Sequence, residues 1–267
     1  MKITRLNGGC IASSYRLDLE NKQTIFIKTH STQDFNKEAN GLRELKKANS
    51  IAVPDILICR KNFLALEWIE SGRKPKNFFK HFAEELAQLH RYTSDNFGFY
   101  EDNYIGSMTQ ENIYDTKNWQ DFYYHKRLLF QIKIAEKNGY ATREFSKAFL
   151  SVEKKLVTLM EGSENIPSLL HGDLWSGNYM IGNKGQAVII DPAVYYGNRE
   201  ADLAMTMLFG GFPMLFYEEY NKAFPLANGY EKRIDLYKLY HILNHMNLFG
   251  ISYRSQAITM MNNLGHE

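Results

Sequence analysis

Cysteine and long apolar runs are both scarce in this sequence. Cys10 and Cys59 are the only cysteines of the 267 residues, and neither lies in the paired spacing of a zinc site or a redox dithiol. No stretch approaches the roughly 18 consecutive apolar residues of a membrane-spanning helix, and residues 1–6 lack the apolar core of a secretion signal. We therefore expect a cytoplasmic protein with two free thiols and no membrane partner.

An excess of charge of one sign is also absent. The formal net charge is +2, and the lysines and arginines are scattered among the acidic residues. A nucleic-acid-binding protein gathers its basic residues in a patch or a stripe. The sequence therefore argues against a nucleic-acid partner and favours a small-molecule substrate.

Apolar residues are plentiful, at 44% of the chain, and aromatic residues make up 14%. This composition suffices for a buried core and argues against disorder. The length is large for one compact domain and small for two independent ones, so we expect two lobes that share a cleft.

The first 70 residues are rich in strand patterns. Residues 15–19 and 24–28 flank a polar break and predict a β-hairpin. Residues 35–49 show helical spacing of apolar positions, and residues 56–58 and 63–69 predict two further strands.

Helical patterns dominate after a linker at residues 70–75. They cover residues 77–92, 119–138 and 143–160 and most of the chain after Ala201. A short hairpin within residues 176–191 interrupts them. The sequence thus predicts an α+β fold, with a small antiparallel-sheet lobe over residues 1–70 and a larger, mostly helical lobe over residues 71–267.

The most specific motif is HGDLWSGN, from His171 to Asn178, followed by Asp191 after the short hairpin. Phosphoryl transfer needs a carboxylate that aligns the attacking hydroxyl and accepts its proton, and oxygen ligands for magnesium. Asp173 fits the first role, and Asn178 and Asp191 fit the second, at the spacing found in kinase-like enzymes. The motif predicts a small-molecule kinase that uses ATP and Mg²⁺.

Each aspartate also has a structural interpretation. Asp173 alone would more often end a turn, and Asp191 alone would more often follow a strand. The complete set at this spacing favours the catalytic interpretation. We expect His171 to be structural, with its ring hydrogen-bonded within the loop.

Lys28 ends the second strand of the first hairpin, where a kinase places the lysine that contacts the α- and β-phosphates. Glu38, ten residues later on the predicted helix, would orient it through an ion pair. Glu44 on the same helix is a competing partner. In isolation each residue would be a solvated surface charge, but together with the downstream motif they favour a nucleotide site.

Two other segments are weaker candidates for the nucleotide site. Gly8 and Gly9 lie in a loop where the lack of side chains permits backbone approach to phosphate. Glu67, Trp68 and Ile69 close the predicted small lobe, where main-chain groups of a kinase contact the adenine edge. Ordinary turn and core roles would explain both segments equally well.

These residues together resemble the fructosamine kinase or ketosamine-3-kinase family, within the wider group of aminoglycoside and choline kinases. The resemblance extends over nearly the whole chain, and Trp175 and residues 102–106 distinguish it from generic aminoglycoside kinases. It implies a protein-kinase-like two-lobe fold. It also implies phosphorylation of the 3-hydroxyl of fructosamines or ribulosamines, free or protein-bound, whose unstable product then frees the amine.

The resemblance carries roles to particular residues. Asp173 would accept the proton, Asn178 and Asp191 would bind magnesium, and Lys28 would contact phosphate. Asp202 would brace the catalytic loop through backbone amides. Substrate-pocket candidates by resemblance alone are Asn103, Arg127, Trp175 and His245.

Some alternatives stay open at this point. The substrate-pocket candidates could equally be structural residues. Cys10, in the expected phosphate loop, suggests either a monomer or a redox-dependent dimer. The protein could also be an aminoglycoside- or choline-type kinase. A non-catalytic pseudokinase is disfavoured because Lys28, Asp173, Asn178 and Asp191 are all present.

Overall fold

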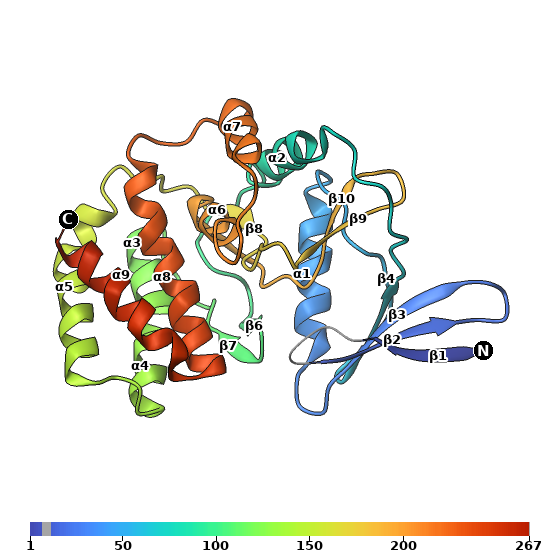
Figure 1. Cartoon of the computed structure of the whole chain (residues 1–267), viewed down its shortest axis with the longest axis horizontal. Helices are drawn as coiled ribbons and strands as arrows, with labels where there is room; N and C mark the ends of the chain where they lie inside the picture. The colour runs from blue at the N-terminus through green and yellow to red at the C-terminus, as the bar shows by residue number, and fades with distance from the viewer. Residues whose placement is uncertain (7–11, 267) are drawn as a thin grey trace.

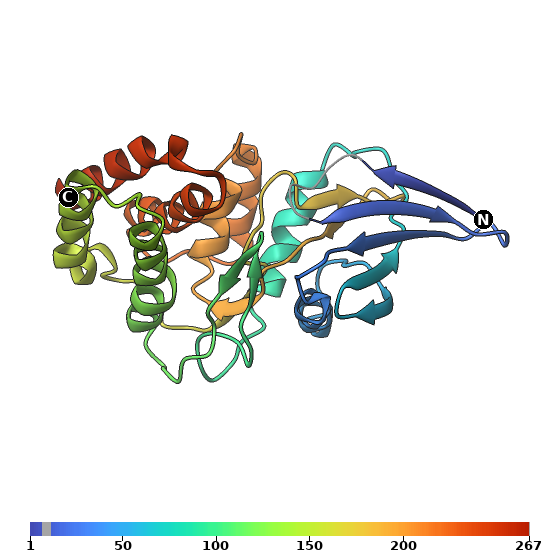
Figure 2. The ribbon, with the colours of Figure 1, turned by 90° about the horizontal axis from the view of Figure 1, so that it is seen from below.

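A computed structural model describes residues 1–6 and 12–266 of the chain. One end of the molecule is a five-stranded antiparallel sheet with the strand order β1-β2-β3-β5-β4, and the other end is a group of helices (Figures 1 and 2). The strands of the sheet are β1 (Lys2–Leu6), β2 (Ser13–Asp18), β3 (Thr24–Thr29), β4 (Ile56–Arg60) and β5 (Phe63–Glu67). The sheet and α1 (Phe35–Lys47) form what we call the sheet lobe.

The predicted first hairpin is confirmed. Strands β2 and β3 pair from Asp18–Thr24 to Ser13–Thr29, and the turn is closed by the amide of Leu19 donating to Gln23 O at 2.8 Å. Phe26 of β3 packs against the small core that α1 forms with the sheet.

Helix α1 begins at Phe35 because Asp34 caps it, accepting a hydrogen bond from the amide of Asn36 at 3.0 Å. Its apolar stripe is buried against β5 in a small core of its own. The members of this core are Phe35, Ala39, Leu42, Leu64 and Leu66. This packing fixes the helix across the sheet, next to the end of β3 that carries Lys28.

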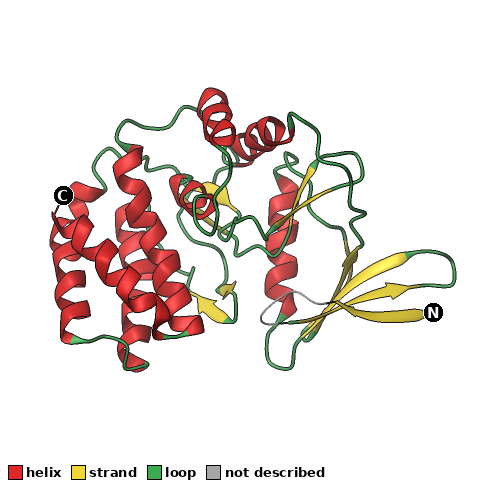
Figure 3. Cartoon of the chain, viewed as in Figure 1, coloured by secondary structure: helices red, strands yellow, loops and turns green. Residues whose placement is uncertain are grey.

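The remaining helices and three short strand pairs form what we call the helical lobe (Figure 3). Its helices are α2 (Phe78–Leu89), α3 (Trp119–Tyr123), α4 (Leu129–Lys137), α5 (Arg143–Leu159), α6 (Glu200–Thr206), α7 (Met214–Ala223), α8 (Tyr230–Phe249) and α9 (Arg254–His266). A π-helical turn (Tyr124–Leu128) joins α3 to α4 where the sequence predicted one continuous helix. Among the described residues, no helix combines the length and the apolar character needed to span a bilayer.

Three short strand pairs belong to the helical lobe. The predicted hairpin within residues 176–191 is confirmed as β9 (Tyr179–Ile181) and β10 (Ala187–Ile189). Two pairs were not predicted, because three-residue strands carry too little periodicity to detect. They are β6 (Asn103–Ile105) with β7 (Met108–Gln110), and β8 (Ser168–Leu170) with β11 (Tyr195–Gly197).

The β9–β10 hairpin lies against the connection between the lobes. The amide of Gly72 donates to Ile181 O at 2.9 Å, and the amide of Ile189 donates to Ala52 O at 3.0 Å. A Cβ atom on Gly72 would lie 2.0 Å from Gly182 O, so only glycine permits this approach. Backbone hydrogen bonds therefore fix both strands of the hairpin that leads to Asp191, β9 through Gly72 and β10 through Ala52.

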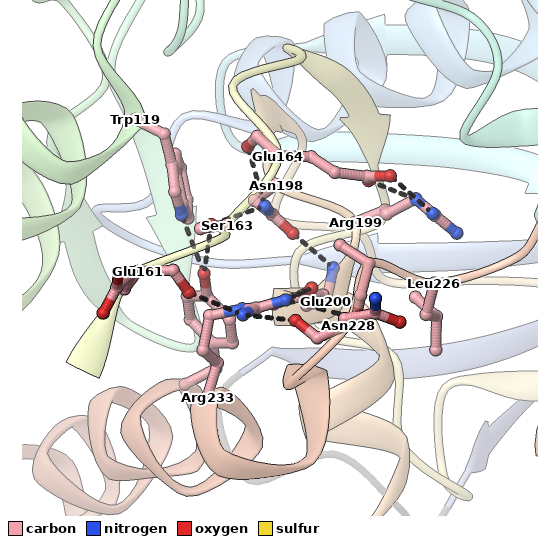
Figure 4. A network of polar contacts seen from close by, with 12 residues as sticks. Trp119, Glu161, Ser163, Glu164, Asn198, Arg199, Glu200, Leu226, Asn228 and Arg233 are labelled. Carbon is pink, nitrogen blue, oxygen red and sulfur yellow. Dashed lines mark hydrogen bonds and ion pairs between the residues drawn. The ribbon is translucent and has the colours of Figure 1, made fainter. Parts of the chain in front are cut away.

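A buried ion pair joins α6 to α8 in the helical lobe (Figure 4). Arg233 is 1% exposed, and its Nε and Nη2 each donate to one carboxylate oxygen of Glu200 at 2.7 Å. Its Nη1 donates to the carbonyl oxygens of Glu161 and Asn228. This two-point geometry satisfies both charges inside the lobe.

We expect Arg233→Met to lower the free energy of unfolding by about 3–5 kcal/mol, because it leaves the Glu200 carboxylate buried without its partner. Urea unfolding followed by circular dichroism measures this. The double variant Arg233→Met, Glu200→Leu should regain part of the loss. If the double variant lost as much unfolding free energy as Arg233→Met or more, the loss would not come from an unpaired Glu200 carboxylate.

Candidate active site

A cavity of about 490 Å³ opens between the sheet lobe and the helical lobe. This volume lies within the range of small-ligand sites. The cavity brings together the five charged or amide side chains that the sequence placed in one site, namely Lys28, Glu38, Asp173, Asn178 and Asp191.

Lys28 lies at the centre of this group. Its Nζ is 2.9 and 2.8 Å from the two carboxylate oxygens of Glu38 and 2.9 Å from Asp191 Oδ1. Burial alone would lower the pKa of Lys28, but the Glu38 and Asp191 charges outweigh it and raise the pKa. Lys28 therefore stays charged, and its partner on α1 is Glu38. Glu44 instead accepts hydrogen bonds from Tyr196 and Lys47.

Asp173 lies half-buried at the other side of the cavity. The side-chain amide of Asn178 donates to Asp173 O at 2.8 Å and to Oδ2 at 3.1 Å. Removal from water raises the pKa of the Asp173 carboxyl, the Asp191 charge raises it further, and the Asn178 hydrogen bond opposes the rise. This environment makes Asp173 a stronger base than an exposed aspartate.

Asp202, on α6, fixes the backbone of the loop that carries Asp173. Its two carboxylate oxygens accept the amides of His171 at 2.7 Å and Gly172 at 2.8 Å. Gly172 has φ +84°, and a Cβ there would lie 2.0 Å from Ala193 O, so the loop requires glycine at this point. These two hydrogen bonds are the backbone contacts that the resemblance implied for Asp202.

Two buried histidines complete this bracing. The ring of His171 bonds to Ile190 O at 2.9 Å and accepts the amide of Asp173 at 3.3 Å, as expected for a structural histidine. The ring of His90 lies 3.2 Å from Asp202 Oδ2 and 2.7 Å from the hydroxyl of Tyr220. Burial lowers the pKa of both histidines, which favours the neutral form of both rings. No sequence pattern indicated the role of His90.

The donor set at the cavity fits a magnesium ion held mainly by phosphates. Asp191 has a left-handed backbone, with φ +55°, and its side chain is 46% exposed. The amide nitrogen of Asn178 is directed to Asp173, which leaves Oδ1 free to act as a ligand. Within the described residues no three His, Cys, Asp or Glu side chains form a metal site by themselves. Magnesium needs no such protein cage, because it keeps waters and binds substrate phosphates.

The other nucleotide candidates are Gly8, Gly9 and residues 67–69. Gly8, Gly9 and Cys10 lie outside the described residues. Glu67, Trp68 and Ile69 do not line the cavity. The ring of Trp68 instead stacks under the guanidinium of Arg16 at 4.8 Å.

One wall of the cavity is aromatic. Trp175 and His245, both substrate candidates, line it. Phe209 lies between them, with ring centroids 6.2 Å from Trp175 and 4.5 Å from His245. Phe209 was not predicted, because its φ of +53° and its contacts arise only from tertiary structure.

The other two substrate candidates, Asn103 and Arg127, make hydrogen bonds to other protein groups. Asn103 borders the cavity, but its amide donates to Val194 O at 2.7 Å and accepts from Gln110 and Asn112. Arg127 is fully buried and does not line the cavity. Its Nη2 donates to Asn112 Oδ1 at 2.7 Å. The guanidinium of Arg127 thus makes its hydrogen bonds inside the helical lobe.

Comparison with known proteins identifies the family of the chain. A sequence model described as fructosamine kinase matches residues 1–267. A "Probable ketoamine kinase" from Synechocystis is 41% identical, over 96% of this chain and 88% of that protein. A "Protein-ribulosamine 3-kinase, chloroplastic" from Arabidopsis thaliana is 39% identical, over 97% and 81%.

Solved structures agree. A Thermobifida fusca structure described as a "putative fructosamine-3-kinase" superposes with a TM-score of 0.91 and is 31% identical, covering 100% of this chain and 94% of that one. An ADP-bound aminoglycoside phosphotransferase superposes with a TM-score of 0.66 at 15% identity, which shows the shared protein-kinase-like fold alone. With a family match over its whole length, the chain belongs to the fructosamine kinase family.

Proposed function

We propose that this protein transfers the γ-phosphate of ATP to the 3-hydroxyl of a ketosamine, a sugar joined through its first carbon to an amine. The observation that carries the proposal is the meeting of Lys28, Asp173, Asn178 and Asp191 around one cavity in a chain of this family. Relatives named ketoamine kinase and ribulosamine 3-kinase support the substrate class.

Asp173 acts as the proton acceptor in this proposal. Its Oδ2 is held by Asn178, which leaves Oδ1 for the substrate hydroxyl. As the hydroxyl oxygen bonds to the γ-phosphorus, its proton passes to Asp173, and the bond to the β-phosphate oxygen breaks to release ADP. The Asp202 hydrogen bonds keep the loop from moving during this transfer.

Lys28 contacts the α- and β-phosphates, with Glu38 holding its ammonium group in place. Asn178 and Asp191 would hold Mg²⁺, which neutralises charge on the phosphate oxygens when it is bound. We assign main-chain contacts with adenine to Glu67, Trp68 and Ile69, and phosphate contacts to Gly8 and Gly9. The lobe boundary at residue 70 is part of the same proposal.

The ketosamine is placed against the aromatic wall of the cavity. Trp175 and His245 can stack on its sugar ring or on its amine-bearing arm. Phosphorylation at the 3-hydroxyl gives an unstable product that loses the amine, so the reaction serves to remove sugar from glycated amines. Both small-molecule and protein-bound ketosamines fit this chemistry.

Other sequence-based predictions accompany the proposal. A cytoplasmic location, the absence of nucleic-acid and membrane partners, and a monomer or a redox-dependent dimer linked through Cys10 stay predictions.

Purified protein with ATP and Mg²⁺ should consume ATP with ribulose-lysine or fructose-lysine. Asp173→Asn should lower kcat by at least about 100-fold, because the amide cannot accept the proton. A coupled ADP assay measures both rates, and nucleotide binding by the variant serves as the control for folding.

Kanamycin and choline test the alternative within the same fold. Turnover of kanamycin or choline, with no turnover of either ketosamine, would reassign the protein to an aminoglycoside- or choline-type kinase. ATP binding without turnover of any of the four would contradict the proposal and favour a pseudokinase or a substrate of another class.

The activity should also depend on pH in one direction. Burial and Asp191 raise the pKa of Asp173 in the free enzyme, so its base form, and with it kcat/KM, is lost as the pH falls through that raised value. The ¹³C carboxyl resonance that disappears in Asp173→Asn should titrate above the ordinary aspartate value of about 3.9. A titration at or below that value in the folded protein would show that the carboxylate is not poised as a base.

A further inference from the structure

One face of α1 is directed at the helical lobe rather than at the sheet. Lys37, Asn40, Gly41 and Glu44 are spaced three and four residues apart, so they form one stripe along the helix. Each of them contacts a residue beyond position 95. Helix α1 therefore belongs to both lobes by its contacts, although it is part of the sheet lobe by sequence.

Glu44 makes the most buried of these contacts. It is 7% exposed, and its Oε1 accepts a hydrogen bond from the hydroxyl of Tyr196 at 2.8 Å. Tyr196 is 8% exposed, and burial together with the Glu44 hydrogen bond raises its pKa, so the hydroxyl remains a donor. The other oxygen of Glu44 accepts from Lys47, which is open to water.

Tyr196 belongs to the strand pair from which the catalytic segments extend. It lies opposite Leu169 in the pairing of β11 with β8, and β8 leads directly into His171 and Asp173. In the other direction along the chain, Asp191 lies five residues before Tyr196. Tyr196 also exchanges two backbone hydrogen bonds with Gly98, at 2.7 and 2.8 Å. Tyr196 is thus fixed relative to the segment that carries Asp173 and to the segment that carries Asp191.

Other contacts of the stripe act in the same direction. Glu101 accepts hydrogen bonds from Lys37 at 2.6 Å and from Asn40 at 2.8 Å. A Cβ on Gly41 would lie 3.1 Å from Val194 Cγ2, which shows how closely the helix backbone approaches the segment after Asp191.

We propose that Glu44 is a positioning residue: through Tyr196 it locks α1 onto the helical lobe and so keeps Glu38 within reach of Lys28 before any nucleotide binds. The inference rests on the proposed phosphoryl transfer. It adds that the lysine–glutamate pair is built into the resting enzyme and needs no separate activation step.

The physical reason is that the position of this helix decides whether such a pair exists. In kinase-like enzymes the helix that carries the glutamate can move, and activity depends on its placement. A buried carboxylate is costly unless it is hydrogen-bonded, so Glu44 favours only those helix positions in which Tyr196 reaches it. The hydrogen bond thus selects the position in which Glu38 meets Lys28.

The test compares Tyr196→Phe and Glu44→Ala with Glu44→Gln, which keeps an acceptor for the Tyr196 hydroxyl. In the ligand-free protein, amide hydrogen exchange of residues 36–47 should become about tenfold faster in the first two variants and stay unchanged in Glu44→Gln. The kcat of the first two should fall about tenfold, and the double variant Glu44→Ala, Tyr196→Phe should fall no further than either single one.

Tyr123→Phe is the matched control, because it removes a buried hydroxyl that donates to Leu236 O at 3.0 Å in the helical lobe. It should leave exchange in α1 unchanged, and Lys47→Ala should do the same. Unchanged α1 exchange in Tyr196→Phe, or additive losses in the double variant, would overturn the inference. Hydrogen exchange needs no turnover, so this result stays separate from a failure of the proposed reaction.

Discussion

The buried ammonium group of Lys28 is the interaction on which the arrangement of this molecule depends. It is 8% exposed and is shared between Glu38 on α1 and Asp191 at the end of the β9–β10 hairpin. A buried charge is tolerated only when its partners reach it from the right directions. The sheet, the helix and the hairpin must therefore come together in one way, and that way creates the cavity.

The opposite wall of the cavity depends on a second buried charge. The Asp202 carboxylate is held between the ring of His90 and the amides of His171 and Gly172. Although burial would raise its pKa, these contacts keep the pKa of Asp202 below its ordinary value. Asp202 stays charged behind the loop, while Asp173, on the same loop, has its pKa raised and faces the cavity. Their surroundings thus give the two carboxylates different roles: Asp202 supports the loop, and Asp173 is placed to act as a base.

The sequence predicted the parts of this site that depend on local spacing. The hairpin before Lys28, the helix that carries Glu38 and the motif around Asp173 each show a clear pattern over a few residues. Patterns could not choose between Glu38 and Glu44, because both lie on one helix and only the packing of that helix decides which one meets Lys28.

Other features of the site depend on long-range packing. Arg127, a substrate candidate by resemblance alone, is buried under Tyr195, with its guanidinium 4.0 Å from the ring centroid. Phe209, with its left-handed backbone, and His90, behind Asp202, gain their roles only from residues distant in sequence. Long-range hydrogen bonds and unusual backbone angles leave little trace in a single sequence.

The replacement Lys28→Met keeps the length of the side chain and removes its charge, and so tests whether the Lys28 ammonium group acts in phosphoryl transfer. We predict that the kcat/KM of this variant for ATP falls by about 10²–10³, the effect of losing one preorganised charge at the reacting phosphates. Circular dichroism of the same sample shows whether the variant is folded. Activity of the folded variant within a few-fold of the unmodified protein would contradict this role, because Lys28 would then only join the lobes.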